Sequence, residues 1–437
     1  MGIRIDGTSD LINATDGSLT IEGQSINTTG IVTAASLVTA DKIIHDGDTN
    51  TAIRFPSADT ISFESGGEEH CRILDTGNFL VGATAVEDWD GSRSHRIQVR
   101  GTSSNNAGFS ALITANDDNP SELVLGKSRG TGNTIVGSAD DIGQIRFAAN
   151  DGAGFHSVAW IRSTMDGTPG SDDLPSNLRF GTSADGGATV SERLRINSSG
   201  QVLIGGTSSV NGWGQTNRLQ VHGSTWDTSG VTIAKLGGNS NSPNLVFTAS
   251  RGSSVGTVVQ NGDRLGYITF TGDDGTDVNS NAAKIYCEVD GSPGSNDLPG
   301  RLIFSTTADG ADSASERLRI SSDGGVALTG HSECSINALG NSSGTVTIDF
   351  RTANYISCTL TGTTTFANPT TESVGQSGSI IITQDGTGSR TASWGSQFKW
   401  VGGTAPTLTT TAAAVDRIDY LVVAADTIHC VASLDVK

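Results

Sequence analysis

The first candidate for a reactive group is the hydroxyl of Ser128. Residues 126–130 read Gly-Lys-Ser-Arg-Gly, which matches the Gly-x-Ser-x-Gly motif of hydrolases that use a serine nucleophile. That motif needs a strand before the serine and a helix after it. Thr-Gly-Asn follows at 131–133, and the repeated copy of the segment has Thr248 and Ala249 in the first two positions. We therefore expect an ordinary turn, and we assign no catalytic residue.

Metal binding has two candidate sources, histidines and clustered aspartates. The 7 histidines contain no His-x-His or His-x-x-x-His pair, and His429 and Cys430 on a strand would point to opposite faces. Acidic clusters at 46–48, 172–173 and 273–277 offer oxygen ligands that suit Ca²⁺, but none completes an EF-hand loop with its terminal glutamate. We expect solvated turn aspartates, with bound Ca²⁺ as an open alternative, and we assign no metal site and no cofactor.

Three aromatic residues gather near the end of the chain, namely Trp394, Phe398 and Trp400. On a strand, Phe398 and Trp400 share one face and Lys399 points to the other. Two interpretations stay open: packing in a core, or an exposed platform on which a sugar ring stacks beside polar side chains. The candidate ligand-contacting residues are Gln397, Lys399 and Trp400.

A repeated unit supplies most of the elements that could position such groups. Residues 191–205 (SERLRINSSGQVLIG) return at 315–328 (SERLRISSDGGVAL) and, more loosely, at 69–82 (EHCRILDTGNFLVG). The two close copies end a longer duplicated module, because segments at 97–99, 123–130 and 166–170 have counterparts at 219–221, 245–252 and 290–294. Modules repeated end to end add length to a protein.

The composition is typical of a turn-rich β protein. Hydrophobic residues make up 35% of the 437 residues, and 57 residues are glycine, whereas globular chains have about 45–50% apolar residues with glycine counted. Short apolar runs recur between glycine-containing turns, and no long helical pattern intervenes. The low apolar content per module favours identical chains that complete each other's cores, as a cyclic homotrimer around a long axis.

The charge balance limits the possible binding partners, and the cysteines indicate the redox compartment. The 27 Lys and Arg residues against 46 Asp and Glu give a net charge of −19, which is unsuited to binding phosphate backbones, so we expect no nucleic-acid partner. No apolar run reaches the length of a membrane span or a signal peptide, so we expect no membrane insertion. The 5 cysteines lack Cys-x-x-Cys spacing and are expected to be small buried hydrophobic residues in a reducing compartment.

The predicted fold is all-β: an elongated homotrimeric fibre of tandem antiparallel β modules with a C-terminal β-sandwich of jelly-roll-like form. Each full module is expected to hold about seven strands, beginning with Arg-Ile-Gln-Val or Arg-Leu-Gln-Val and continuing with Leu-Val-Leu or Leu-Val-Phe. The predicted divisions are an N-terminal attachment segment (1–50, irregular and extended), a half-module of β-hairpins (51–93), shaft module 1 (94–215), shaft module 2 (216–332) and the C-terminal sandwich (333–437).

Residue alternation in the repeated hairpin indicates how each sheet packs. In the segment 192–196, Leu194 and Ile196 should point to one face, and Arg193 and Arg195 to the other. We expect the apolar face to be buried and the charged face solvated. The Asn-Ser-Ser-Gly turn at 197–200 should return the chain as a β-hairpin that closes the module.

Two stretches resemble a known family. Residues 41–60 (DKIIHDGDTNTAIRFPSADT), together with the Glu-Arg-Leu-Arg-Ile units, resemble tail fibre and other virion fibre proteins of cyanobacterial and marine bacteriophages. Residues 384–408 (QDGTGSRTASWGSQFKWVGGTAPTL) resemble the terminal β-domain of many phage tail proteins. The sequence departs from the family pattern at His70 and Cys71, which leaves the regularity of the first hairpin as an open question at this point.

The resemblance implies a trimeric virion protein of the phage tail, assembled in the host cytoplasm. Its N-terminus would bind a tail, baseplate or adaptor protein, and its distal domain would bind a host envelope glycan or outer-membrane protein, with Gln397, Lys399 and Trp400 as receptor-binding residues. Multivalent attachment would turn weak contacts into stable adsorption. Two alternatives stay open, a non-adhesive fibre at the collar, neck or head vertex, and a polysaccharide depolymerase with paired carboxylates. We expect a protein that is not an enzyme.

Overall fold

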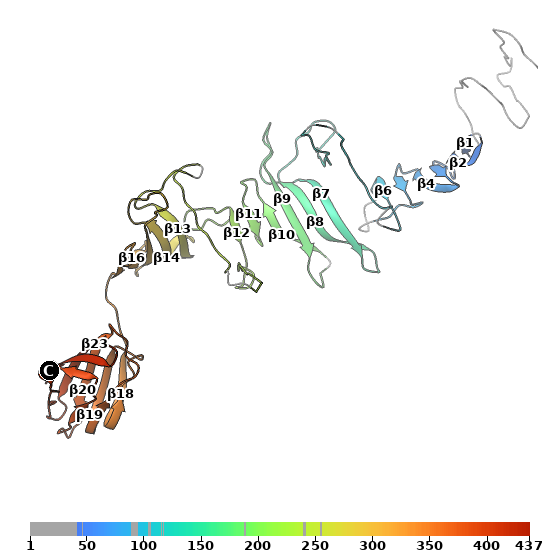
Figure 1. Cartoon of the computed structure of the whole chain (residues 1–437). Coiled ribbons are helices and arrows are strands. Elements are labelled where there is room, and N and C mark those ends of the chain that lie inside the picture. The colour runs from blue at the N-terminus through green and yellow to red at the C-terminus, as the bar shows by residue number, and fades with distance from the viewer. Residues whose placement is uncertain are drawn as a thin grey trace, which may run out of the picture. The chain divides into compact units, whose positions relative to one another are not determined.

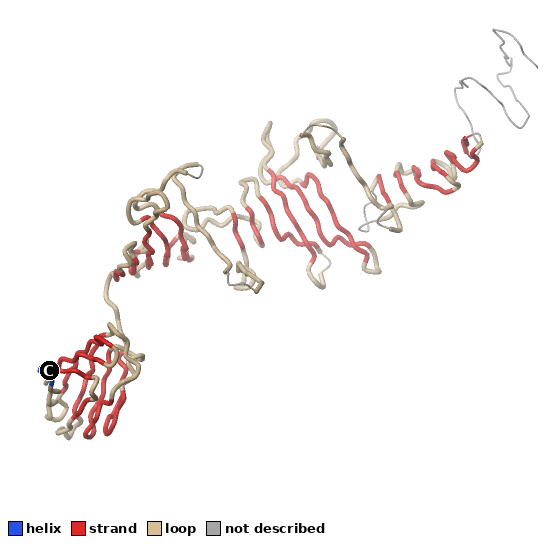
Figure 2. The backbone as a smooth tube through the Cα atoms, in the orientation of Figure 1, coloured by secondary structure: helices blue, strands red, loops and turns tan. Residues whose placement is uncertain are grey.

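The computed structural model describes residues 42–45, 47–88, 95–103, 106–114, 116, 118–187, 189–238, 242–253 and 256–437. Within these residues, every regular element except one short 3-10 turn is a β-strand (Figures 1 and 2). The all-β prediction is confirmed. Most of the N-terminal segment 1–50 falls outside the described residues, and the irregular structure expected there is wrong for its last part, where strands begin at Lys42 and Asp48. The chain divides into two compact units, Met1–Val210 with Thr216–Thr232, and Asn211–Gln215 with Ile233–Lys437.

The first unit begins with a six-stranded sheet whose strands follow one another in chain order. Neighbours are antiparallel except β6, which runs parallel to β5. The strands are β1 (Lys42–His45), β2 (Asp48–Arg54), β3 (Ile61–Ser65), β4 (Glu68–Ile73), β5 (Phe79–Val81) and β6 (Ile97–Val99).

The second sheet of this unit repeats the same plan with longer strands. It is antiparallel from β7 to β11 and closes with β12, which runs parallel to β11. The strands are β7 (Asp141–Asn150), β8 (Phe155–Met165), β9 (Ser176–Ser183), β10 (Val190–Ile196), β11 (Val202–Ile204) and β12 (Leu219–Val221).

The second unit holds a five-stranded antiparallel sheet that matches β7 to β11 strand for strand. The strands are β13 (Arg264–Gly272), β14 (Ser280–Val289), β15 (Gly300–Thr306), β16 (Ser315–Ile320) and β17 (Val326–Leu328). Together, the three sheets bear out the predicted tandem antiparallel modules.

Two of the seven strands expected in each module behave differently in the structure. The Ile-Gln-Val and Leu-Gln-Val runs become β6 and β12, so each closes the preceding sheet instead of opening the next one. The runs at 123–125 and 245–247 form no strand. An apolar run of strand composition becomes a strand only if its backbone finds a partner, and these runs have none among the described residues.

A β-bulge in each repeated hairpin changes which side chains share a face. Glu192 pairs with Gly181 and Leu194 pairs with Phe180, so Arg193 is the extra residue of a bulge. The shift puts Glu192 and Arg195 on one face. His70 and Arg317 occupy the bulge position in the other two copies, where His70 and Cys71 fit the pattern without disturbing the hairpin.

The prediction of a buried apolar face and a solvated charged face is wrong for the single chain. The Arg195 and Glu192 side chains are only 12% and 15% exposed, because they bind each other at 2.5 Å and lie against the sheet. Ile196, on the apolar face, is 38% exposed, and Phe147 on the same face is 51% exposed. The apolar faces of the sheets are therefore left uncovered within one chain.

The C-terminal domain forms a seven-stranded sheet in the order β18-β19-β20-β23-β24-β22, with β21 joined to β19. The domain departs from the predicted jelly-roll-like sandwich, whose strands would pair antiparallel, because β18, β20 and β21 all pair parallel with β19, and β22 pairs parallel with β24. The strands and the 3-10 turn are β18 (Ile336–Thr347), β19 (Tyr355–Ala367), β20 (Ser377–Gln384), β21 (Ala392–Trp394), β22 (Phe398–Trp400), η1 (Val401–Gly403), β23 (Val415–Ala424) and β24 (Thr427–Ser433).

This domain contains a hydrophobic core of its own. Its buried members come from β19, β20, β22, β23 and β24 and from neighbouring loops, and include Phe350, Phe366 and Ile380, each at most 1% exposed. Among the largest fully buried side chains of the described residues, the three earlier sheets supply one each, Leu80, Leu203 and Ile303. The C-terminal domain therefore holds the largest buried core of the described residues, although Leu421, Val423 and Val431 of β23 and β24 stay exposed.

Candidate functional site

The three aromatic residues near the end of the chain meet in the structure. Trp394 of β21 lies 4.9 Å from Trp400 and 5.1 Å from Phe398 between ring centroids, both in edge-to-face contact, and it stacks on Phe366 at 4.5 Å. Phe398 is buried in the core, while Trp394 and Trp400 pack against it half-buried. The group is chiefly a core cluster that joins β21 to the terminal strand β22. Its member Trp400 lies on the same strand as Lys399.

The other two candidate residues lie beside this cluster. The Lys399 side chain is exposed, opposite the face of Phe398 and Trp400 as predicted, and its Nζ donates to the backbone oxygen of Ser396 at 2.6 Å. The Gln397 side chain donates through Nε2 to Asp426, and its backbone N–H donates to Asn368 Oδ1 at 2.9 Å. The three residues are thus adjacent in the chain, but the ammonium group of Lys399 and the partly exposed indole of Trp400 lie on opposite faces of β22.

Two polar atoms of this region are enclosed without a hydrogen-bond partner, the indole Nε1 of Trp394 and Oε1 of Gln397. An unpaired polar group costs stability when it is buried. The sequence identified Gln397 as a candidate, but it did not show that Nε2 of the side-chain amide is hydrogen-bonded while Oε1 is enclosed without a partner.

Ser128 lies in a turn, as expected. Its Oγ donates to the backbone oxygens of Gly132 and Thr134, both at 2.9 Å, and its surroundings at 126–134 form loop rather than a strand-to-helix elbow. The hydroxyl is occupied in closing the turn.

The acidic cluster at 273–277 also serves a turn. Asp274 accepts the backbone N–H groups of Thr276 and Asp277 and the hydroxyl of Ser280, and these donors lower the pKa of its carboxyl to about 2. Among the described residues, no group of three or more His, Cys, Asp or Glu side chains is placed to hold a metal ion. The Ca²⁺ alternative gains no support from this loop.

The five cysteines differ in burial, with two buried, Cys71 and Cys287 half-buried, and one exposed. Cys358 and Cys430 are buried, as predicted, and burial raises the pKa of their thiols to about 11 and about 12. Cys334 is exposed, contrary to the prediction. His429 is exposed while Cys430 is buried, so the two point to opposite faces as expected and cannot share a metal ion.

Ion pairs on the charged faces are a feature that the sequence did not reveal. In the second sheet, Arg179 bridges Glu192 at 3.5 Å and Asp141 at 3.0 Å, and the guanidinium of Arg162 lies 4.6 Å from the ring centroid of the buried Trp160. In the third sheet, Glu288 is enclosed between Arg264 at 3.1 Å and Arg301 at 2.7 Å. The repeated Glu-x-x-Arg spacing was the available signal, but the bulge that aligns the two charges was not foreseeable from the alternation.

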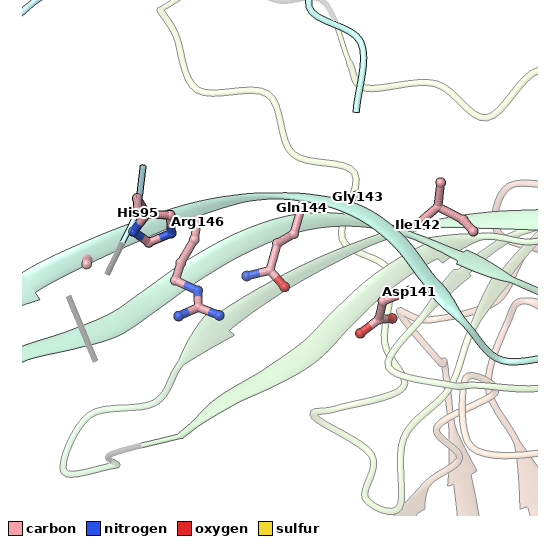
Figure 3. Close-up of a pocket in the computed structure, with 7 residues that line it drawn as sticks. His95, Asp141, Ile142, Gly143, Gln144 and Arg146 are labelled. Atoms are coloured by element: carbon pink, nitrogen blue, oxygen red, sulfur yellow. The ribbon is translucent and has the colours of Figure 1, made fainter. Parts of the chain in front are cut away.

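Two surface hollows lie beside the open edge strands. The larger, of about 560 Å³, runs along β7 and is lined by His95 and by Asp141, Gly143, Gln144 and Arg146 of that strand (Figure 3). The other, of about 300 Å³, lies in the second unit, where Phe247 meets apolar residues of β13, β14 and β15. Neither of these two groups a nucleophile with a base. A third hollow, of about 360 Å³ at the end of β7, is lined by Asp151, His156 and Ser157, but His156 and Ser157 are consecutive on β8 and point to opposite faces.

Comparison with known proteins gives a family for one part of the chain. Residues 343–422 match the family described as "Putative phage tail fibre C-terminal domain". This confirms the predicted resemblance of the C-terminal region to phage tail proteins, and the matched residues lie within the domain that holds the core. No curated protein matches the chain.

Two solved structures from bacteriophage T5 are also similar to this chain. One is the carboxy-terminal domain of the L-shaped tail fibre, with 14% identity and a TM-score of 0.43 over 53% of this chain and 94% of the other. The second is that domain with its intra-molecular chaperone domain, with 15% identity and a TM-score of 0.44 over 52% of this chain and 64% of the other.

In the described residues, no helix has the length and apolar character needed to span a membrane.

Proposed function

We propose that this chain is a subunit of a bacteriophage tail fibre that binds the host-cell surface through its C-terminal domain. The observation that carries the proposal is the match of residues 343–422 to a tail fibre C-terminal domain. The tandem sheets that precede the domain support a structural role, because they repeat one plan along the chain.

The fibre is a homotrimer in this proposal. The uncovered apolar faces support it, since Ile145, Phe147 and Leu178 of the second sheet and Ile268, Phe270 and Leu302 of the third occupy matching positions and are all exposed. Covering apolar surface of this extent with a second copy removes it from water, which is favourable, whereas the net charge of −19 on each chain opposes close approach. In a cyclic assembly, the apolar face of every copy is covered by the same surface of its neighbour.

Contact with the host rests on the margin of the C-terminal sheet around Lys399. The proposed contact residues are Gln397, Lys399 and Trp400. Lys399 offers an exposed cation on one face of β22 and Trp400 a partly exposed indole on the other, groups that suit an envelope glycan or the surface of an outer-membrane protein, while Gln397 holds the adjoining turn through its bond to Asp426. Three identical copies would make the attachment multivalent, so each site need bind only weakly.

The remaining parts of the proposal follow from the fibre role. The N-terminal segment attaches the subunit to a tail, baseplate or adaptor protein, and the assembled fibre forms in the host cytoplasm and stays in the virion tail. The chain is not an enzyme in this proposal, and it binds neither nucleic acid nor membrane.

The test is an adsorption assay with the purified full-length protein. Added protein should reduce the rate of phage adsorption to host cells, and light scattering should give three times the mass of one chain. A trimer that leaves adsorption unchanged would favour the non-adhesive fibre of the collar, neck or head vertex. Release of reducing sugar from host envelope would favour the depolymerase, and a monomer at all concentrations would contradict the trimer.

A further inference from the structure

Two equivalent segments of the chain have the composition of strands but no strand partner. We call residues 122–126 (Glu-Leu-Val-Leu-Gly) and 244–248 (Asn-Leu-Val-Phe-Thr) the donor segments. In the first, Leu123 is 69% exposed and Val124 is 78% exposed, and in the second Val246 is 74% exposed. Three consecutive apolar residues are typical of a strand that is covered on both faces.

The backbone of the donor segments lacks the bonds that a strand needs. Among the described residues, no backbone–backbone hydrogen bond involves residues 122–126 or 244–248. Water can satisfy these groups in an isolated chain, but the apolar side chains then stay in water as well. The two segments therefore gain most from an arrangement that pairs their backbone and covers their side chains together.

The sheets also have backbone groups that lack a strand partner. β7 and β13 are the terminal strands of their sheets, so each leaves one row of backbone N–H and C=O groups without a ladder partner. Along β7 the surface is hollowed by about 560 Å³, and its lining consists of residues of β7 and His95 (Figure 3). An extended segment laid in this hollow would add a strand to the sheet.

The chain's own donor segments touch these edge strands without pairing to them. An atom added at the Cβ position of Gly143 would lie 2.6 Å from Cβ of Leu125, and one added at Gly266 would lie 2.6 Å from Cβ of Phe247. Each donor segment therefore crosses its edge strand at a glycine, and the rest of the segment stays without a backbone partner. The glycines permit the crossing because they have no side chain at the point of closest approach.

We propose that the donor segments of one copy pair as added strands with the open edges of β7 and β13 of a neighbouring copy. This rests on the assembly of identical copies in the proposed function and names the residues that link them. The occupant is a second copy because donor and recipient occur together in both modules at equivalent places. A host molecule is not expected to complement the open edge strands of both modules. In each sheet the added strand also extends the exposed apolar face, which holds Phe147 in the second sheet and Phe270 in the third.

The first experiment places a photoreactive amino acid at position 124 of the full-length protein. Irradiation should give covalent products of more than one chain on a denaturing gel, with cross-linked peptides from residues 141–150. Products confined to single chains would overturn the proposal. The same residue at position 401, on the exposed η1 turn of the other unit, serves as the control and should give no link to 141–150.

The second experiment measures hydrogen exchange in the assembled protein. The amides of 122–126 and 244–248 should exchange at least ~100-fold more slowly than unstructured peptides, since ladder bonds protect them. Val124→Pro with Val246→Pro removes two amide donors and should abolish the protection and most inter-chain cross-links. The matched pair Val124→Thr with Val246→Thr retains strand propensity and should keep both.

The outcomes separate this inference from the proposed function. A trimer whose donor segments exchange freely would overturn strand donation and leave the fibre role intact. Inter-copy cross-links from position 124 in a protein that does not affect adsorption would support strand donation and contradict the adhesive role.

Discussion

Arg251 holds Asp263 by two parallel hydrogen bonds, from Nε to Oδ2 at 2.6 Å and from Nη2 to Oδ1 at 2.7 Å. Arg129 and Asp140 form the same pair in the preceding module, at 2.7 and 2.9 Å. In both modules the arginine follows the donor segment and the aspartate precedes the edge strand. The pair therefore fixes the end of each donor segment relative to the strand that it crosses.

Acid should release the loop between Arg251 and Asp263. Hydrogen bonds from Arg251 and from the backbone of Gln260 lower the pKa of Asp263 from 3.8 to about 2. A carboxyl whose pKa is depressed on folding stabilises the fold above its unfolded pKa, and the contribution is lost as the pH falls through the folded value. We expect pepsin to cleave 251–263 faster at pH 2 than at pH 4.

The control for this prediction is Asp263→Asn. The amide cannot titrate, so cleavage relative to a reference peptide should be fast at both pH values. Equal protection of the natural loop at pH 2 and pH 4 would contradict the prediction.

Gly266→Ala should displace Phe247 from β13. The new methyl group would lie 2.6 Å from Cβ of Phe247, a contact that forces the segment to move, and overpacking of this kind costs about 1–3 kcal/mol. Hydrogen exchange should become faster in 251–263. Gly272→Ala, on the same strand with nothing within 4 Å of the added carbon, is the matched control and should change little.

Phe366→Ala should lower the unfolding free energy of the C-terminal domain more than a substitution at its surface does. The ring is fully buried and stacks on Trp394 at 4.5 Å, so its removal should cost about 3–5 kcal/mol of unfolding free energy. Hydrogen exchange of β19 and β20 in increasing denaturant gives the measurement. Val401→Ala, at a side chain that is 79% exposed, should change the midpoint little, and equal effects of the two variants would contradict the assigned core.

Lys399→Ala should weaken adsorption without changing the fold. The side chain is exposed, and its bond to the Ser396 oxygen is local, so stability should change by less than about 0.5 kcal/mol. The concentration of protein needed to block adsorption should rise by about tenfold or more, since a small loss at each site is multiplied in a trimer. Lys437→Ala removes another exposed lysine and should leave blocking unchanged, and an equal effect of both variants would argue against a site at Lys399.

The sequence predicted the β-structure of the repeated hairpins because their local signals agree. Leu194 and Ile196 alternate with charged residues, and Gly200 takes the positive φ of 73° that the turn after them requires. Residues 384–408 likewise pointed to a terminal domain, and the family match at 343–422 agrees.

What the sequence could not predict depends on long-range pairing. The parallel partners of β19 come from β18, β20 and β21, and no local pattern distinguishes such a strand from an antiparallel one. The bulge at Arg193 likewise depends on the register with β9. For the candidate site, strand alternation placed Phe398 and Lys399 on opposite faces correctly, whereas the bond between Gln397 and Asp426 joins two separate loops and has no local signature.

The large core of the C-terminal domain has a consequence for biosynthesis. A ribosome releases the sheets with uncovered apolar faces before residues 336–433, which hold that core. Nascent subunits would thus expose apolar surface while those residues are still being made, and alignment of several chains would wait for the C-terminal domains to form. Pairing of the sheets would then run from the C-terminal domain back toward the N-terminus.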